Sequence, residues 1–499
     1  MMSSTKLRAR SRTRSLLIKL GAALAGLTLI SVPGAVADEG AAAERDCSDP
    51  GATLVPNRYD EEFCVFDDEL FVFAANYKPF EYSPTEDRQA TRVFDEMIGN
   101  KLRAAFPDLK IKYATWDMPI RYEDLQAAGV VPDIVIDNPR NRIDRDLEPL
   151  GWVEDMTPGL AEAGVDLAPL NQAAIELVRS RSDGGLYGVP VFIDEHLLFY
   201  NKAIFDKFGR SYPKPGWTYD DAYKAAKRLT RQDGLAAYKG YLQHPDNYLE
   251  FNQRGLYPFT DAGSEQPAPE DVAIDLTTEE WAELGANLER FLLIPRNGFT
   301  TVDDLVKGDM SRPGRVAMAV DSLRKLPLYA GSELMTDDGD EESYAEWMKS
   351  VDLGIAPVPV LEQGSTTIYQ PNTLAAFVTK QSAKKEAAYQ VIKWLVSEEA
   401  QTELSRHAIK AVLPTEQVIA SFGEAIPELK EIDTSAVYWG ENATVTGYQN
   451  TEYWDIPLYM VFRQHVLKDA MTVDSALIVA DQEDIPAYIK SRAEAGFDF

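Results

Sequence analysis

The sequence predicts an α/β fold in which one chain forms at least two lobes. Short apolar segments, typical of buried strands, alternate with segments whose apolar residues recur every three or four positions, as in amphipathic helices. This alternation favours parallel or mixed sheets with helices on their faces. The chain has 499 residues, more than one hydrophobic core usually supports. Its 45% hydrophobic and 26% charged residues are typical of globular cores.

The strands and helices are expected in a definite order along the chain. Strands are predicted at 70–75, 109–113, 134–136, 189–200, 315–320, 353–358 and 373–378. Helices are predicted at 86–106, 166–180, 218–231, 278–293 and 383–404. Thr218 and Asp221 have the spacing of a capping box, which fixes the start of the third helix. Pro107 ends the first helix.

The first 37 residues, 1–37, have the parts of a secretory signal peptide. Six Lys and Arg residues flank or precede an apolar run, LGAALAGLTLI, and Ala35-Val36-Ala37 forms a cleavage site. The run is shorter than a membrane-spanning helix requires, and no second run of that length follows. The small apolar residues of a lipid-attachment motif do not precede Cys47. We therefore expect a soluble protein that is exported to the periplasm or the extracellular medium.

The expected mature chain is strongly acidic. The full sequence has a net charge of −30, and loss of the six basic residues of the signal makes it −36. A field of this sign repels phosphate backbones and anionic membrane surfaces. The charge therefore argues against nucleic acid as a partner, although a local site for an anion can still exist.

Residues 38–65 are expected to form a polar N-terminal arm that contains both cysteines of the chain, Cys47 and Cys64. In an oxidising compartment one disulfide is the natural interpretation, and two free thiols are the alternative. The bond would constrain the unfolded chain and stabilise the fold by roughly 3 kcal/mol.

Polar residues follow several predicted strands. Asn76 follows the first strand, Asp137 and Asn138 follow the third, and Asp321 follows the fifth. In α/β sheets ligands bind beyond the carboxyl ends of the strands, so we expect these side chains to contact a polar ligand. The alternative is that Asp137-Asn138 and Asp321-Ser322 are turns stabilised by their own side chains.

Asp194 and Glu195 lie within the apolar segment LYGVPVFIDEHLLFYNK (186–202), where acidic residues are unusual. Neighbours on a strand point to opposite faces, so the two carboxylates cannot flank one glycosidic bond as a catalytic pair. At most one of them faces a ligand, where a carboxylate would accept hydrogen bonds from vicinal hydroxyls. A solvent-facing pair is the alternative.

One aromatic residue adds a possible stacking surface to the candidate site. Trp439, beside Gly440 in a predicted loop, could stack against a sugar ring, and a core position is the alternative. The four histidines lie far apart without metal-ligand spacing, and no nucleotide or cofactor motif occurs in a credible context. We predict neither a metal nor a cofactor.

Several landmarks occur in an order that resembles a known family. LYGVP and LFYNKAIFDKFG are followed by GWTYDD, GRVAMAVDS, VDLGIAPVP and NTLAAFVTKQSAKKEAAYQVIKWLVSEEAQTELSR. The set, over most of residues 70–415, resembles the extracellular solute-binding proteins of family 1, the maltose-binding-protein-like sugar-binding subunits of ABC importers. The resemblance implies a type II periplasmic-binding-protein-like fold. Its two lobes, each a mixed sheet flanked by helices, are joined by crossover strands and close on a sugar.

The resemblance also implies boundaries and site residues. The family's usual acid falls at Asp194, which makes it the preferred ligand contact over Glu195. The return to the first lobe falls near Tyr369 and Asn372, which are candidate ligand contacts, although this chain lacks the glycine pair that the family often has there. Lobe 1 is expected at 66–190 and 370–432, and lobe 2 at 191–369 and 433–499.

We therefore expect a monomeric receptor rather than an enzyme. It would capture a carbohydrate, in the first place an oligosaccharide, and deliver it to the permease subunits of an ABC importer. Two alternatives remain. One is an exported glycoside hydrolase or lyase that pairs Asp194 with Asp137 or Asp321, and the other is a solute-binding protein for polyamines, favoured by the acidic charge.

Overall fold

The computed structural model describes residues 47–56, 63–74, 95–114, 120–182, 184–243, 245–259, 272–297, 315–330, 351–445, 465–466 and 469–495. The predicted signal peptide and the candidate ligand residue Asn76 lie outside these ranges. In the described part of the chain, no helix combines the length and the apolar character needed to cross a membrane.

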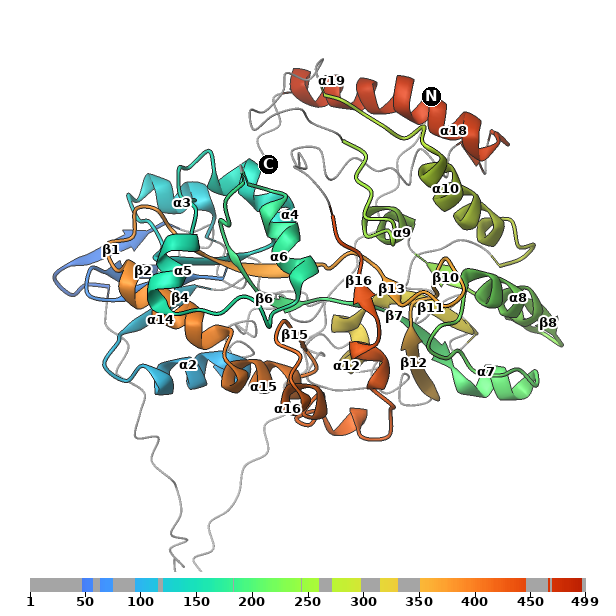
Figure 1. Cartoon of the computed structure of the whole chain (residues 1–499), viewed down its shortest axis with the longest axis horizontal. Coiled ribbons are helices and arrows are strands. Elements are labelled where there is room, and N and C mark those ends of the chain that lie inside the picture. Colours follow the sequence, from blue (N-terminus) through green and yellow to red (C-terminus); the bar gives the residue numbers. More distant parts are fainter. Residues whose placement is uncertain are drawn as a thin grey trace, which may run out of the picture. The chain divides into compact units, whose positions relative to one another are not determined.

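A six-stranded mixed sheet forms the first of two main sheets (Figure 1). Its order is β15 (Lys410–Ala411), β6 (Val189–Ile193), β14 (Thr373–Val378), β5 (Ile134–Asp137), β3 (Leu70–Phe73) and β4 (Ile111–Ala114). β3 runs parallel to β4 and β5, whereas β14 runs antiparallel to both β5 and β6. β14 therefore joins two strands that come from earlier, separate parts of the chain.

Helices on this sheet bury one apolar cluster with it. The cluster contains Ile134, Val189 and Phe377 from the strands, each with at most 1% of its surface exposed. The surrounding helical elements are η1 (Asp95–Gly99), α2 (Asn100–Ala105), α3 (Tyr122–Ala127), α4 (Pro139–Arg142), η2 (Ile143–Leu147), α5 (Thr157–Ala163), α6 (Gln172–Arg179), α14 (Lys385–Leu395) and α15 (Glu398–Arg406).

A four-stranded mixed sheet has the order β10 (Leu242–Gln243), β11 (Met318–Ser322), β7 (His196–Asn201) and β12 (Leu353–Pro357). β7 runs antiparallel to both of its neighbours. Side chains alternate between two apolar clusters along β7, because Leu198 and Tyr200 belong to one cluster while Leu197 and Phe199 belong to the other. Both faces of this sheet are thus covered, which explains its nearly continuous apolar sequence.

The elements around the four-stranded sheet come from distant parts of the sequence. They are α7 (Lys202–Lys207), α8 (Tyr219–Leu229), α9 (Pro245–Glu250), α10 (Glu279–Leu292), η4 (Leu323–Lys325), α12 (Leu326–Tyr329), α16 (Glu416–Ala420), η6 (Pro427–Leu429), η7 (Ser435–Tyr438), α18 (Val473–Val479), η9 (Ala480–Asp484) and α19 (Ile485–Ala495). Two small pairings complete the set: β8 (Arg231–Asp233) with β9 (Ala236–Tyr238), and β13 (Thr367–Ile368) with β16 (Glu441–Asn442).

The predicted single strand at 189–200 is wrong, because two strands occupy this segment in two different sheets. β6 ends at Ile193 and β7 begins at His196. The backbone stays bonded across the break: Asp194 N donates to Asn372 O at 2.7 Å, and Leu323 N donates to Glu195 O at 2.6 Å. The segment therefore changes partners between the two acids.

Two further expectations need correction. The predicted helix at 383–404 is two helices, because Ser397 caps the start of α15 by accepting a hydrogen bond from Ala400 N. The predicted strand at 315–320 is shifted, since β11 covers Met318–Ser322 and includes Asp321, which was expected to follow it. The polar side chains of Asp321 and Ser322 remain compatible with this strand because each finds a hydrogen-bond partner.

The lobe boundaries stay a prediction. The apolar clusters nevertheless place one segment differently from the expected division: Phe422, Ile426 and Leu429 pack in the cluster that contains Phe199 of β7. The sequence placed this segment, up to residue 432, with the first lobe.

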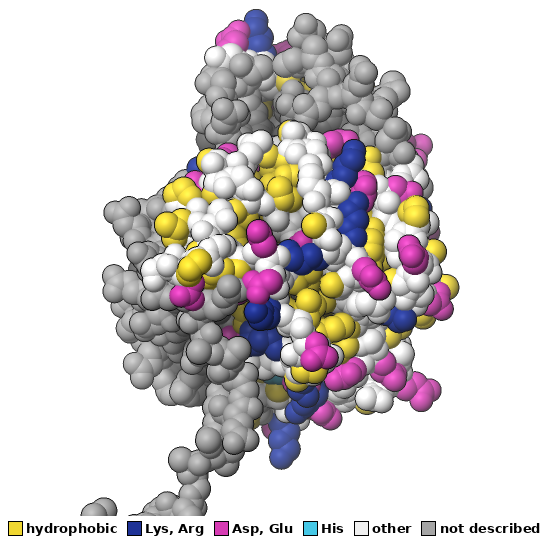
Figure 2. Space-filling view, turned by 90° about the vertical axis from the view of Figure 1, so that its left-hand side faces the viewer, with side chains coloured by type: hydrophobic (Ala, Val, Ile, Leu, Met, Phe, Trp, Pro, Cys, Tyr) yellow, Lys and Arg dark blue, Asp and Glu magenta, His cyan; other side chains and the backbone are white. Residues whose placement is uncertain are grey.

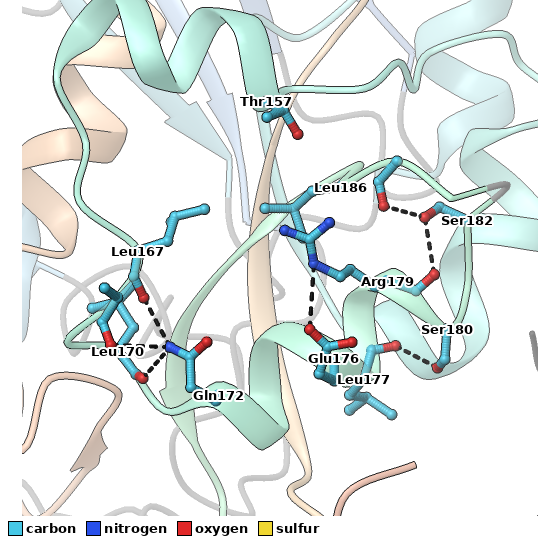
Figure 3. Close-up of polar contacts among 12 residues, drawn as sticks. Thr157, Leu167, Leu170, Gln172, Glu176, Leu177, Arg179, Ser180, Ser182 and Leu186 are labelled. Atoms are coloured by element: carbon cyan, nitrogen blue, oxygen red, sulfur yellow. Dashed lines mark hydrogen bonds and ion pairs between the residues drawn. The ribbon is translucent and has the colours of Figure 1, made fainter. Parts of the chain in front are cut away.

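Hydrogen bonds at both ends of α6 fix the chain before it enters β6 (Figure 3). Gln172 Nε2 donates to the carbonyl oxygens of Leu167, Ala168 and Leu170 at 2.8–3.2 Å. After the helix, Ser182 Oγ donates to the carbonyl oxygen of Gly185 at 2.6 Å. Because serine hydroxyls at such turns replace the missing backbone partners, the loop between α6 and β6 is held in one path.

The N-terminal arm packs on the six-stranded sheet. β1 (Ala52–Val55) and β2 (Phe63–Phe66) form an antiparallel pair, and the predicted disulfide joins Cys47 to Cys64. The ring of Phe63 lies 5.8 Å from that of Phe71 in β3.

Figure 2 shows that basic and acidic side chains are interspersed on the described part of the face that it presents. The acidic side chains therefore do not form a patch of one sign on the described part of this face.

The predicted capping box at the start of α8 is confirmed. Asp221 N donates to Thr218 Oγ1 at 3.2 Å, and Thr218 N donates to Asp221 Oδ2 at 3.2 Å. We expect Thr218→Ala to lower the free energy of unfolding by about 1 kcal/mol, since the first turn loses this acceptor. Urea unfolding followed by circular dichroism measures the change. Thr218→Ser keeps the oxygen and is the matched control, and an equal loss in both variants would contradict the capping role.

His465 is expected to make stability depend on pH. Its ring nitrogens lie 2.6 Å from Asp484 Oδ2 and 3.0 Å from Asp469 Oδ2, and the hydrogen bond to Asp484 is the main cause that raises its pKa. The pKa of His465 in the folded protein exceeds its unfolded value of 6.5. The stabilisation from its pairing with the two aspartates is therefore complete below pH 6.5 and is lost as the pH rises through the folded pKa. We expect the melting temperature of the wild type to lie further above that of His465→Gln at pH 5.5 than at pH 8.5. A difference that does not change with pH would count against this ion pair.

Candidate functional site

Asp194 lies where the two main sheets meet, with 13% of its side chain exposed. Its Oδ1 accepts hydrogen bonds from Ser322 Oγ at 2.6 Å and from Arg324 N at 3.2 Å. Arg324 Nε approaches Oδ2 at 3.4 Å. The carboxylate at the end of β6 therefore contacts β11 and η4, which belong to the four-stranded sheet.

Two asparagines continue from Asp194 across the six-stranded sheet. Asn372 Nδ2 lies 3.5 Å from Asp194 Oδ2, and Asn138 Nδ2 donates to Asn372 Oδ1 at 3.1 Å. Asn138 is oriented by its second role, because its Oδ1 accepts from Arg140 N at the start of α4. We call these three partly exposed residues, Asn138, Asn372 and Asp194, the polar row. The sequence predicted all three as ligand contacts, and the fold brings them together.

Glu195 differs sharply from its neighbour, since only 1% of its side chain is exposed. Lys410 Nζ donates to its Oε2 at 2.7 Å, Asn442 Nδ2 donates to the same oxygen at 2.8 Å, and His196 N donates to Oε1 at 3.0 Å. The two adjacent acids thus have separate sets of partners, although neither of them lies in a strand, where alternation was expected to separate them. A ligand would meet Asp194 before Glu195.

Asp137 and Asp321 are buried at equivalent ends of strands in the two sheets. Tyr122 donates its hydroxyl to Asp137 Oδ2 at 2.5 Å, and Tyr329 donates its hydroxyl to Asp321 Oδ2. Burial, followed by the charge of Asp137, raises the pKa of Tyr122 well above its usual value, so its hydroxyl keeps the proton it donates. Both carboxylates are engaged by tyrosines of helices, Tyr122 of α3 and Tyr329 of α12, and their predicted ligand role stays a prediction.

Tyr369 is fully buried, and its hydroxyl lies 2.6 Å from that of Tyr219. Gln243 also donates to this hydroxyl through Nε2. Burial raises the pKa of Tyr369 well above its usual value. Trp439 is partly exposed and packs against the same apolar cluster as Tyr369. For both residues a ligand contact stays a prediction, and Asn76 lies outside the described residues.

Sequence reasoning missed three polar residues that surround Phe251. The guanidinium of Arg140 lies 4.5 Å from the centre of the Phe251 ring, and the His196 ring lies 4.9 Å from it. Gln370 N donates to Phe251 O at 2.9 Å. Each of the three stands two positions from a member of the polar row, a spacing visible in the sequence only once the row is known. Phe251 itself has no signal in the sequence that points to this place.

These three side chains retain hydrogen-bonding capacity although at most 4% of each residue is exposed. Arg140 Nε and Nη2, His196 Nδ1 and Gln370 Oε1 have no hydrogen-bond partner within the described structure. Burial, and then the nearby Arg181, lower the pKa of Arg140 to about 10, so it stays charged at neutral pH. Burial also lowers the pKa of His196, which favours the neutral ring. Buried polar atoms are almost always paired, so these donors and acceptors suit a polar ligand or water.

The arrangement suits binding better than chemistry. Carboxylate, amide and guanidinium groups converge on the junction of the sheets, where they can donate and accept several hydrogen bonds at once. Among the described residues, no group of three or more His, Cys, Asp or Glu side chains is placed to hold a metal ion. A separate cavity of about 370 Å³, lined by Lys101, Trp394 and Glu403 among others, contains none of the predicted site residues.

Comparison with solved structures identifies the fold. A sugar transporter from Rhizobium etli superposes with a TM-score of 0.61 at 18% identity, over 85% of this chain and 99% of that one. The cyclic α-maltosyl-1,6-maltose-binding protein of Arthrobacter globiformis gives 0.58 at 18% identity, with coverage of 85% and 99%. A Mycobacterium tuberculosis protein in complex with glycerophosphocholine gives 0.55 at 14% identity, also over 85% and 99%. The predicted two-lobed periplasmic-binding-protein-like fold is confirmed.

The family model for bacterial extracellular solute-binding proteins matches residues 101–432, about two thirds of the chain. The match includes all three members of the polar row, together with Glu195 and Lys410. A protein of this kind is a transport receptor and not an enzyme, so the resemblance seen in the sequence is confirmed and the hydrolase alternative is overturned. The chain belongs to the bacterial extracellular solute-binding protein family.

Proposed function

We propose that this receptor captures a carbohydrate, in the first place an oligosaccharide, and delivers it to the permease subunits of an ABC importer. The polar row is the observation that carries the proposal. Its two amides and one carboxylate offer donors and acceptors side by side, which matches the vicinal hydroxyls of a sugar. The protein would act as an exported monomer.

Arg140 and Phe251 support the same ligand class. Two guanidinium nitrogens of Arg140, Nε and Nη2, have no hydrogen-bond partner among the described residues, and the Phe251 ring lies 4.5 Å from this guanidinium. Sugar-binding sites commonly combine apolar ring surfaces with a few fixed polar groups. The names of two of the solved relatives, one a sugar transporter and one a maltosyl-maltose-binding protein, point in this direction as well.

A polyamine is the alternative that the acidic charge suggested. Around the junction, however, the described acids already have basic or polar partners, namely Arg324 at Asp194 and Lys410 at Glu195. Arg140 adds a positive charge at the same place. A polycation would meet two arginines there, so the local charge favours a neutral or acidic ligand over a polyamine.

Calorimetric titration of the purified protein with a panel of oligosaccharides and spermidine tests the proposal. We expect saturable binding of one molecule of at least one oligosaccharide, because the polar row provides several directional hydrogen bonds at a single place. Spermidine should give no saturable heat. Tight binding of spermidine without binding of any sugar would overturn the proposal.

Asp194→Asn tests the residue that the row depends on most. The change keeps the shape but removes the charge that strengthens its hydrogen bonds, so we expect ligand affinity to fall about tenfold to a hundredfold. Calorimetry with the sugar identified in the panel measures the loss. Asp108→Asn, an exposed acid after α2, is the control and should leave affinity unchanged. Equal affinities in both variants would remove Asp194 from the site.

A further inference from the structure

Glu195 is the centre of a buried hydrogen-bond network. Its carboxylate accepts from Lys410 Nζ, Asn442 Nδ2 and the backbone N of His196, all within 3.0 Å. The side chains of Glu195 and Lys410 are 1% and 5% exposed. Both oxygens are therefore engaged by protein groups, and solvent has almost no access to the ion pair.

The network extends to both main sheets. Asn442 Nδ2 also donates to Tyr369 O at 2.9 Å, and Asn171 Nδ2 donates to Asn442 Oδ1 at 3.1 Å. Asn171 caps α6 and Lys410 lies in β15, which are both parts of the six-stranded-sheet lobe. Tyr369 packs in a cluster of the four-stranded-sheet lobe. The network thus links the two lobes at the point where β6 passes into β7.

The contacts of Asp194 contrast with this network. Two of its four side-chain contacts, to Arg324 Nε and Asn372 Nδ2, measure 3.4 and 3.5 Å, and the carboxylate is partly exposed. The Asp194 side chain is 13% exposed against 1% for Glu195, and these two contacts are longer than any that Glu195 makes. Breaking a buried pair leaves an uncompensated charge, so the Glu195 contacts cost more to break. Two neighbouring acids therefore have different capacities for movement.

We propose that Glu195 and Lys410 form a fixed pivot between the lobes, and that the Asp194–Arg324 contact is the one that changes when the lobes move. Glu195 is then a positioning residue, which holds the crossing segment so that Asp194 keeps its orientation toward the polar row. The proposal goes beyond the proposed function, because the pivot acts whichever solute is bound.

Distances between spin labels on the two lobes test the pivot in the protein without added solute. Lys101→Cys in α2 and Leu235→Cys between β8 and β9 provide exposed sites for the labels, and both native cysteines are in the disulfide. In the double variant Glu195→Gln/Lys410→Met, the loss of both charges leaves no unpaired ion. We expect its melting temperature to stay near that of wild type while the distance distribution becomes about twofold wider, because alternative lobe arrangements become populated.

Two further variants complete the test. Glu195→Gln alone should widen the distribution and also lower the melting temperature, since Lys410 is left buried without its partner. Lys385→Met, which breaks the more exposed pair with Glu154, should change neither quantity. A double variant that folds and keeps the wild-type distance distribution would overturn the pivot, and so would an equally wide distribution in wild type. Neither result depends on which solute the receptor binds.

Discussion

The structure depends on one extended segment that belongs to two sheets. Val189–Ile193 pairs with β14 and β15, and His196–Asn201 pairs with β11 and β12. The two residues between them bond through their backbones to neighbours of these sheets, Asp194 to Asn372 just before β14 and Glu195 to Leu323 just after β11. Because the segment is fixed on both sides, its backbone determines the direction of the two side chains between the strands. The carboxylate of Asp194 is directed toward Asn372, its neighbour in the polar row, and that of Glu195 into the interior.

This constraint explains why neighbouring acids have different environments. Asp194 meets a hydroxyl, a backbone N–H and an arginine at a place that solvent reaches, whereas Glu195 meets a lysine and an asparagine in the interior. A buried carboxylate is tolerated only when its oxygens are satisfied, which Lys410, Asn442 and His196 N achieve together. Residues far apart in the sequence are thus needed to make one short dipeptide stable.

Local signals in the sequence predicted much of the fold. The capping box at Thr218, the strand at 373–378 and the helix that begins after Thr278 depend on short-range patterns, and the structure contains all three. The family resemblance implied a crossover between the lobes within 189–199, but local patterns predicted one continuous strand there, because both halves are apolar and the change of partner is tertiary. Of the site, the polar row was predicted as ligand contacts, from strand ends and from the family resemblance. Arg140, His196 and Gln370 were missed because Phe251, which brings them together, is distant from each of them in sequence.

The position of β14 has a consequence for how the chain folds as it leaves the ribosome. β5 and β6 are not neighbours, and both pair with β14, which is synthesised about 180 residues after β6. Until residues 373–378 emerge, one edge of β5 and both edges of β6 lack native partners, since β15 follows still later, and these edges can pair wrongly with another chain. Pairings between such distant segments also form slowly. The first sheet is therefore completed late, and the nascent chain depends on protection of its open strand edges during most of its synthesis.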